Sequence, residues 1–227
     1  MMPGSAAIPG GPAASRDAGG PRDAGAPGSA AILGGPRGWY SRGYLPHLDE
    51  PGLYQSINFR LDDSVPQSVI QRWQAELQWR ADLPSDAPEW VKLRQQLVEY
   101  EDAGHGACWL RQAAIATLVE DALFYFDGHR YRLLAWCIMP NHVHVLIETW
   151  AGHPLGTVLH TWKSYTAQKA NQILKQSGAF WARDYYDRYM RDDEHFQQMV
   201  AYIEQNPVTA KLVKSAGDWK FSSAARR

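Results

Sequence analysis

The sequence predicts an α+β fold, with a mainly antiparallel sheet and helices packed on one face of it. Three observations support this: an alternating apolar and polar segment at 54–61, a strand–turn–strand pattern at 131–148, and helical periodicity in the other segments. Strands joined by a tight turn, with helices between and after them, favour such a two-layer arrangement. The chain has 227 residues, of which 45% are hydrophobic, which is enough for one core and an appendage.

The first 37 residues are rich in Gly, Ala and Pro and show no hydrophobic periodicity. GSAAIPGGP at 4–12 recurs as GSAAILGGP at 28–36. This composition predicts a disordered leader at 1–37, although an upstream translation artefact would have the same composition. We expect one folded domain at 38–227.

The segment YQSINFRL at 54–61 predicts a half-buried strand, because its apolar and polar residues alternate. Its apolar face would carry Ile57, Phe59 and Leu61, and its polar face Ser56, Asn58 and Arg60. Helices are then expected from Ser64 to about residue 80, over about 88–101, and over about 109–126.

Two strands are expected at 131–138 and 142–148, joined by a tight turn at 139–141. A helix that is basic on one side follows at 155–174. Asp192 can cap a last helix that Pro207 would end at about residue 206. The open face of the sheet is expected to carry the polar residues of 54–61 and two histidines of the second hairpin strand.

Those histidines are His142 and His144, at positions i and i+2 of the predicted strand. Side chains two apart in a strand point to the same face. Two neutral imidazoles held side by side on a sheet suit a metal ion. A pair of structural histidines remains the alternative reading of this pattern.

The last predicted helix carries Tyr202 and Asn206 on one flank, four residues apart and outside its apolar stripe. An amphipathic Tyr at the rim of the core and an Asn at the helix end would give the same pattern. His195 lies on the same flank, where it is either a surface residue or a proton acceptor.

The motifs MPNHVHVLI and, about 55 residues later, YIEQNPVTAKLV resemble those of the REP-associated tyrosine transposases, a branch of the single-tyrosine HUH transposases and nucleases. GWYSRGYLPHLD, INFRLDDSVP, FWARDYYDRYMRD and WKFSS are also similar to that group, so the resemblance covers about residues 38–223. It implies a ferredoxin-like or RRM-like HUH nuclease core.

The resemblance also implies residue roles. His142 and His144 match the metal-binding histidines, Tyr202 matches the nucleophile, and Asn206 matches the polar residue that completes the metal site. The implied activity is cleavage and transfer of single-stranded DNA through a 5′-phosphotyrosine, with a divalent metal ion, Mg²⁺ or Mn²⁺, as the cofactor. A protein that binds such hairpins without cutting them remains the alternative.

The implied partner is single-stranded or hairpin DNA with REP-like palindromes. Local charge agrees with it, since residues 129–227 hold 13 Lys and Arg against 8 Asp and Glu. Tyr185, Tyr186 and Tyr189 could stack on bases or serve as rival nucleophiles. The candidate DNA contacts are Arg42, Tyr44, Arg60, Lys163, Arg183, Arg188 and Arg191.

The sequence shows no candidate membrane span or secretory signal, and Cys108 and Cys137 are expected as buried free thiols. We expect a cytoplasmic, nucleoid-associated bacterial protein that is a monomer or a homodimer. A histidine-triad hydrolase would need a histidine at position 146, which is Leu. A structural zinc site would need more cysteine ligands than Cys137.

Overall fold

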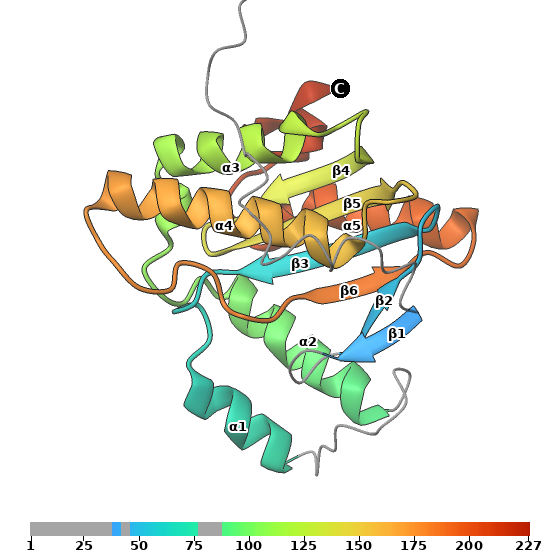
Figure 1. Cartoon of the computed structure of the whole chain (residues 1–227). Helices are drawn as coiled ribbons and strands as arrows, with labels where there is room; N and C mark the ends of the chain where they lie inside the picture. Colours follow the sequence, from blue (N-terminus) through green and yellow to red (C-terminus); the bar gives the residue numbers. More distant parts are fainter. Residues whose placement is uncertain (1–37, 42–45, 77–87) are drawn as a thin grey trace, which may run out of the picture.

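The computed structural model describes residues 38–41, 46–76 and 88–227 (Figure 1). The expectations for the leader at 1–37 and for Arg42 and Tyr44 therefore lie outside the described residues. Strands β1 (Gly38–Ser41) and β2 (Pro46–Asp49) pair antiparallel as a separate two-stranded sheet.

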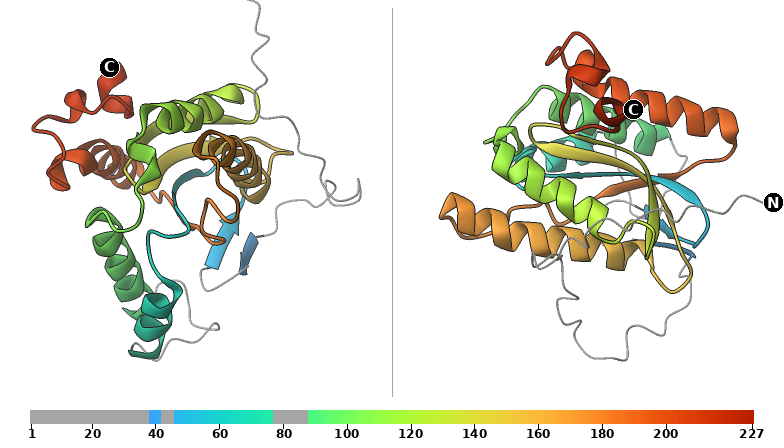
Figure 2. Two further views of the ribbon diagram at one scale, coloured as in Figure 1. Left: turned by 90° about the vertical axis from the view of Figure 1, so that its left-hand side faces the viewer. Right: turned by 90° about the horizontal axis from the view of Figure 1, so that it is seen from above.

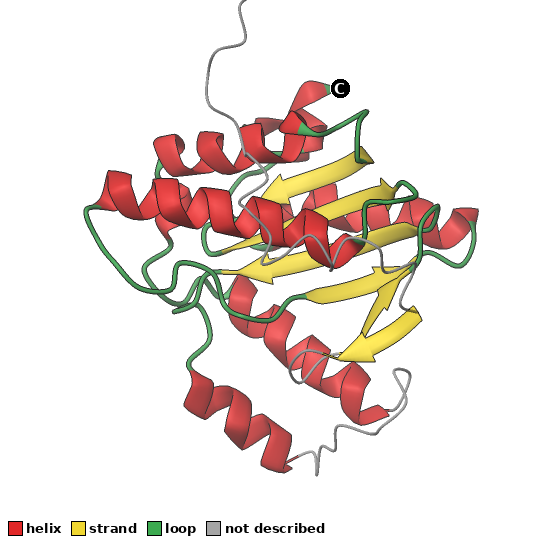
Figure 3. Cartoon of the chain, viewed as in Figure 1, coloured by secondary structure: helices red, strands yellow, loops and turns green. Residues whose placement is uncertain are grey.

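The central sheet has four strands in the order β4-β5-β3-β6, and all of its pairings are antiparallel (Figure 3). The strands are β3 (Tyr54–Arg60), β4 (Tyr131–Ile138), β5 (His142–Thr149) and β6 (Tyr186–Tyr189). The strand and the hairpin expected from the sequence are confirmed. The sequence did not predict β6, because its residues YDRY lack an apolar run and become a strand by pairing with β3 at the edge of the sheet.

The helices are α1 (Gln67–Glu76), α2 (Pro88–Asp102), α3 (Ala113–Tyr125), α4 (Leu155–Leu174) and α5 (Asp193–Thr209). One expected end was wrong, since α5 continues through Pro207 to Thr209. Proline removes only one donor here, close to the end of the helix. The carbonyls of Asn206 and Pro207 still accept hydrogen bonds, from the amides of Ala210 and Leu212, both at 2.9 Å.

Helices α3 and α4 lie side by side on one face of the central sheet (Figure 2). The apolar side of β3 and β5 packs against them, as period-2 alternation requires. Phe59, for example, is 1% exposed and packs with Trp162 and Trp181. The α+β class with a mainly antiparallel sheet is confirmed.

The second face of the sheet is not open, contrary to the expectation. Val200 and Ile203 of α5 are apolar, and they are buried against Ala135 and Leu146 of the sheet. Beside them the last turn of α2 covers the polar face of β3, where Ser56, Asn58 and Arg60 are at most 8% exposed. The alternation of a strand shows which face is polar but not what covers that face, so only tertiary packing settles this point.

Helices α1 and α2 form an extension below the sheet in Figure 1, with a small apolar cluster of their own that includes Ile70, Trp73 and Leu93. The end of α2 contacts β3 of the sheet, although the helix packs in a cluster separate from the main core. Among the described residues, none of the helices is long and apolar enough to cross a membrane.

Candidate metal centre and nucleophile

The two histidines of β5 face each other at the centre of the covered face. His142 and His144 are 1% and 3% exposed, and their Nε2 atoms lie 2.9 Å apart. Burial lowers the pKa of both imidazoles, that of His144 to about 4, so both are neutral at pH 7. Two nitrogen lone pairs at this distance repel each other unless a proton or a cation lies between them.

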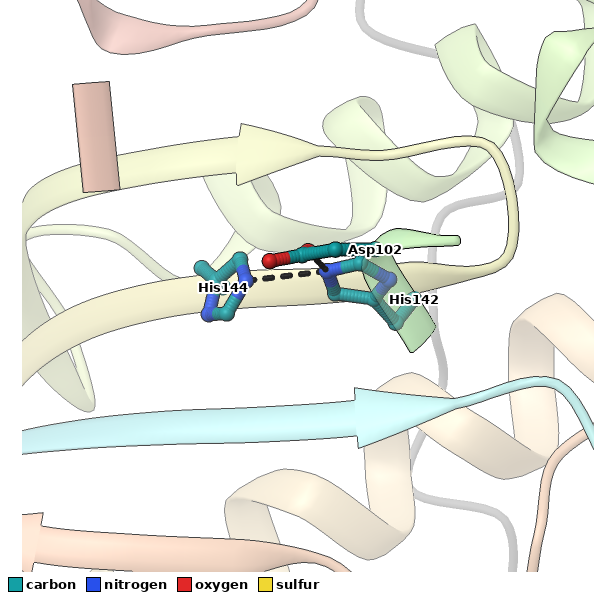
Figure 4. Close-up of side chains that lie close together, drawn as sticks. All are labelled: Asp102, His142 and His144. Carbon is teal, nitrogen blue, oxygen red and sulfur yellow. Dashed lines mark hydrogen bonds and ion pairs between the residues drawn. The ribbon is translucent and has the colours of Figure 1, made fainter. Parts of the chain in front are cut away.

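Asp102, the last residue of α2, completes a cluster with the two histidines (Figure 4). Its Oδ1 lies 3.5 Å from His142 Nε2, and the ligand atoms of all three residues lie within 4.8 Å of one another. This Oδ1 is buried without a hydrogen-bond partner, and burial raises the pKa of Asp102 to about 6. A bound cation would satisfy this carboxylate.

Sequence reasoning missed Asp102. It precedes His142 by 40 residues and sits at the end of a helix in another part of the chain. The pair Glu101-Asp102 before Ala103-Gly104 looks like an ordinary acidic helix end. No local pattern indicates that tertiary packing brings it to the histidines.

Asn206 approaches the same histidines from α5. Its Nδ2 lies 3.2 Å from His144 Nε2, the residue is 2% exposed, and its Oδ1 is buried without a partner. The oxygen and nitrogen of an amide are almost the same size, so a half-turn of the group would present Oδ1 to the centre instead. Asp102, beside His142, and Asn206, beside His144, can each supply an oxygen ligand.

Tyr202 lies one helical turn before Asn206, with its ring against His144. The ring centroids are 5.5 Å apart at an interplanar angle of 82°, and the residue is 41% exposed. Burial raises the pKa of the Tyr202 phenol above its usual value, the charges of Asp102 and Glu101 raise it further, and hydrogen bonding with Asn206 lowers it. The phenol is therefore protonated at neutral pH in the metal-free protein.

The donor set fits a divalent cation. Two imidazole nitrogens at 2.9 Å match neighbouring positions around a metal with metal–nitrogen bonds of about 2.1 Å. Mixed nitrogen and oxygen ligands suit Mn²⁺, whereas Mg²⁺ prefers oxygen. Cys137 is opposite His144 in the hairpin register, but its thiol contacts Met139 Sδ at 3.6 Å. Within the described chain, the metal-type cluster contains no cysteine, and both cysteines are buried and free, as expected.

The predicted DNA contacts that the structure describes lie on several elements, namely β3, α4, β6 and the loops beside β6. Arg60 is 8% exposed and forms an ion pair with Glu101 at 3.5 Å, so it is turned inward. Lys163 Nζ donates to the carbonyls of Ala182 and Arg183, at 2.7 and 3.0 Å. Arg183 and Arg191 are exposed, and Arg188 is half-buried on β6.

Three further side chains that the sequence left open now have positions. Tyr185 is 8% exposed within the core, and Tyr186 packs beside the α1–α2 cluster. His195 lies in the first turn of α5, where its amide donates to Asp192 at 2.7 Å and its Nδ1 accepts from the Arg191 amide at 3.3 Å. The ring of His195 therefore accepts a backbone hydrogen bond just before the start of the helix.

Residues 115–206 match the family described as "Transposase IS200 like". Over this segment the chain is similar to the IS200-like transposases, and the segment is less than half of the chain. The matched segment runs from α3 to Asn206 and includes both histidines and Tyr202, whereas Asp102 lies outside it. The resemblance expected from the sequence is confirmed.

The chain is also similar to a Haemophilus influenzae protein that carries the provisional name REP-associated tyrosine transposase. The two are 27% identical over 111 residues, which are 44% of this chain and 62% of the relative, so the match spans less than two thirds of that protein. Two solved structures are similar at 17% identity. One is a REP-associated tyrosine transposase bound to a REP hairpin, with a TM-score of 0.46 and 82% of each chain covered. The other is a provisionally named transposase from Deinococcus radiodurans, with a TM-score of 0.30, 74% of this chain and 96% of that one covered.

Proposed function

We propose that this protein is a metal-dependent single-strand DNA endonuclease and strand transferase that acts on hairpin DNA through a phosphotyrosine at Tyr202. One observation carries the proposal: the Tyr202 ring packs on His144, which belongs to a buried cluster of metal-type ligands. His142 and His144 would hold the metal ion, with Asn206 and Asp102 as oxygen ligands.

The proposed reaction exchanges one phosphodiester for another. The phenolic oxygen of Tyr202 attacks the phosphorus, the bond from phosphorus to the 3′ oxygen breaks, and the 5′ phosphate stays on the tyrosine. The phenol gives up its proton, and the leaving 3′ oxygen ends as a hydroxyl. The number of phosphate ester bonds is unchanged, so the step needs no ATP or water and a second 3′ hydroxyl can reverse it.

A divalent ion at this centre would neutralise charge on the scissile phosphate and orient it. The residues of the chain would supply uncharged nitrogen ligands and hold the nucleophile in position. Both imidazoles are uncharged at pH 7 because of burial, and Asn206 fixes one turn of α5 against His144. Since α5 also packs on the sheet through Ile203, the Tyr202 side chain is held on a rigid element beside the centre.

The proposed partner is single-stranded or hairpin DNA with REP-like palindromes, which the name of the Haemophilus influenzae relative supports. Among the predicted phosphate contacts that the structure describes, Arg183 and Arg191, on either side of β6, are exposed. The proposal places the protein with the bacterial nucleoid in the cytoplasm, as a monomer or a homodimer.

The test is incubation of the protein with end-labelled hairpin oligonucleotides and Mn²⁺ or Mg²⁺, followed by denaturing gels. The proposal predicts that a 5′ label will appear in a shortened strand with a free 3′ end, and that a 3′ label will appear in a protein band that resists denaturation. Omission of the metal should abolish both products. Tight hairpin binding in gel-shift assays without any cleavage would show a DNA-binding protein that does not cut, which is the competing function.

A further inference from the structure

The turn between β4 and β5 holds a buried asparagine that contacts both sides of the centre. Asn141 is 0% exposed. Its Nδ2 donates to the carbonyl of Glu101 at 3.0 Å and to that of His105 at 2.9 Å. Its Oδ1 lies 2.8 Å from His142 Nδ1. One side chain thus joins the end of α2 to the first histidine.

These contacts fix which nitrogen of His142 carries the proton. Both backbone carbonyls only accept hydrogen bonds, so the amide nitrogen of Asn141 must face them and its oxygen must face the imidazole. An amide oxygen also only accepts, and His142 Nδ1 must therefore be the N–H donor. A neutral imidazole carries only one N–H, so a proton on Nδ1 leaves the lone pair on Nε2, which is the atom that faces His144.

The same asparagine sets the position of Asp102. The carbonyl of Glu101 belongs to the residue directly before Asp102, and that of His105 lies three residues after it. Asn141 holds the backbone on both sides of Asp102. Two contacts of the Glu101 side chain, with Asn58 at 2.9 Å and Arg60 at 3.5 Å, dock the same turn on β3.

We propose that Asn141 is a positioning residue for the metal centre, which selects the Nδ1–H tautomer of His142 and holds Asp102 beside its free Nε2. This inference rests on the proposed function, in which both residues bind a cation. Partners of this kind orient metal-ligating histidines in proteins, and their loss weakens metal affinity by about 10- to 100-fold.

The first experiment reads the tautomer in the metal-free wild-type protein. Long-range ¹H–¹⁵N NMR spectra at pH 7 distinguish a protonated ring nitrogen from one with a free lone pair. The proposal predicts that the proton of His142 is on Nδ1. A proton found mainly on Nε2 of His142 would overturn it, and this measurement requires neither a variant nor catalytic activity.

The second experiment measures Mn²⁺ affinity by calorimetry for two variants. Asn141→Ala removes both the acceptor for His142 and the donor for the carbonyls near Asp102. It should lower Mn²⁺ affinity about 10- to 100-fold and give a mixture of His142 tautomers. Asn141→Asp keeps an acceptor for Nδ1–H and should keep the wild-type tautomer, which distinguishes orientation from simple loss of structure. If Asn141→Ala does not fold, the tautomer in wild type and in Asn141→Asp still decides the question.

Asn171 provides the matched control, because its Nδ2 donates to the Gly178 carbonyl at 3.0 Å near the end of α4, away from the histidines. Asn171→Ala should leave Mn²⁺ affinity unchanged. A folded Asn141→Ala protein with wild-type affinity would refute the inference. Failure of the wild-type protein to bind Mn²⁺ would instead refute the proposed metal dependence, while the tautomer measurement would still test Asn141.

Discussion

The ring of Tyr202 stands nearly perpendicular to that of His144, with 5.5 Å between the centroids. This contact joins α5 to β5, and its two residues lie more than 50 positions apart in the sequence. Since Asn206 reaches His144 from the next turn of the same helix, the helix brings an aromatic ring and an amide to one imidazole. The geometry links the proposed nucleophile to the proposed metal ligands.

Replacement of Asp102 tests the ligand that the sequence did not reveal. Asp102→Asn keeps the size of the side chain and removes its charge, so Mn²⁺ affinity should fall at least about 10-fold, because even partners behind the ligands contribute that much. Glu99→Gln is the control, since Glu99 lies on the same helix but is exposed and bonded to Gln95. Calorimetric titration of both variants measures the difference, and equal affinities would remove Asp102 from the centre.

The centre could be predicted only in part, because some of its residues are positioned by local periodicity and others by contacts between distant parts of the sequence. His142 and His144 share a face through the period of a strand, and Tyr202 and Asn206 share a flank through the period of a helix, so both pairs could be read locally. Asp102 and Asn141 acquire their positions through contacts between α2 and the hairpin turn. Contacts across 40 residues leave no periodic signal.

The same distinction applies to the fold. Strand β3 carries its alternation in its own residues, whereas β6 is a strand only because β3 offers it an edge. The burial of Arg60 likewise depends on Glu101, a residue of another element. An arginine on a polar strand face was therefore a reasonable candidate for DNA, and tertiary packing gives it an ion pair within the protein.

Phe59 tests the core between the sheet and the α3–α4 layer. The residue is 1% exposed and its ring lies 4.9 Å from that of Trp181. Phe59→Ala should lower the free energy of unfolding by about 3–5 kcal/mol through lost burial and a cavity. Ile173→Ala, at a residue that is 48% exposed on α4, should change it by less than about 0.5 kcal/mol. Urea denaturation measures both, and similar values would contradict the packing described.

Lys163 should make stability depend on pH in the alkaline range. Burial lowers the pKa of its ammonium group from 10.5 to about 8. Between these values the unfolded chain holds a proton that the folded protein has released, so this residue makes stability rise as pH increases from 8 to 10.5. The full effect is at most about 3 kcal/mol.

The test compares the free energy of unfolding of wild type with that of Lys163→Met, whose side chain cannot titrate. As pH rises from 8 to 10.5, the free energy of unfolding of wild type should increase relative to that of the variant. Denaturant titrations at pH 8 and pH 10 would measure the change. A constant difference between the two proteins would show that the lysine is not desolvated.

The central claim is that Tyr202 forms the covalent bond to DNA. The direct measurement is mass spectrometry of tryptic peptides after reaction with a hairpin oligonucleotide and Mn²⁺, together with the same reaction of Tyr202→Phe. We predict a nucleotide phosphate on the peptide that contains Tyr202, and no adduct in the variant, which should still bind Mn²⁺ as the wild type does. A phosphate on Tyr185, Tyr186 or Tyr189, or an adduct that persists in Tyr202→Phe, would contradict the account.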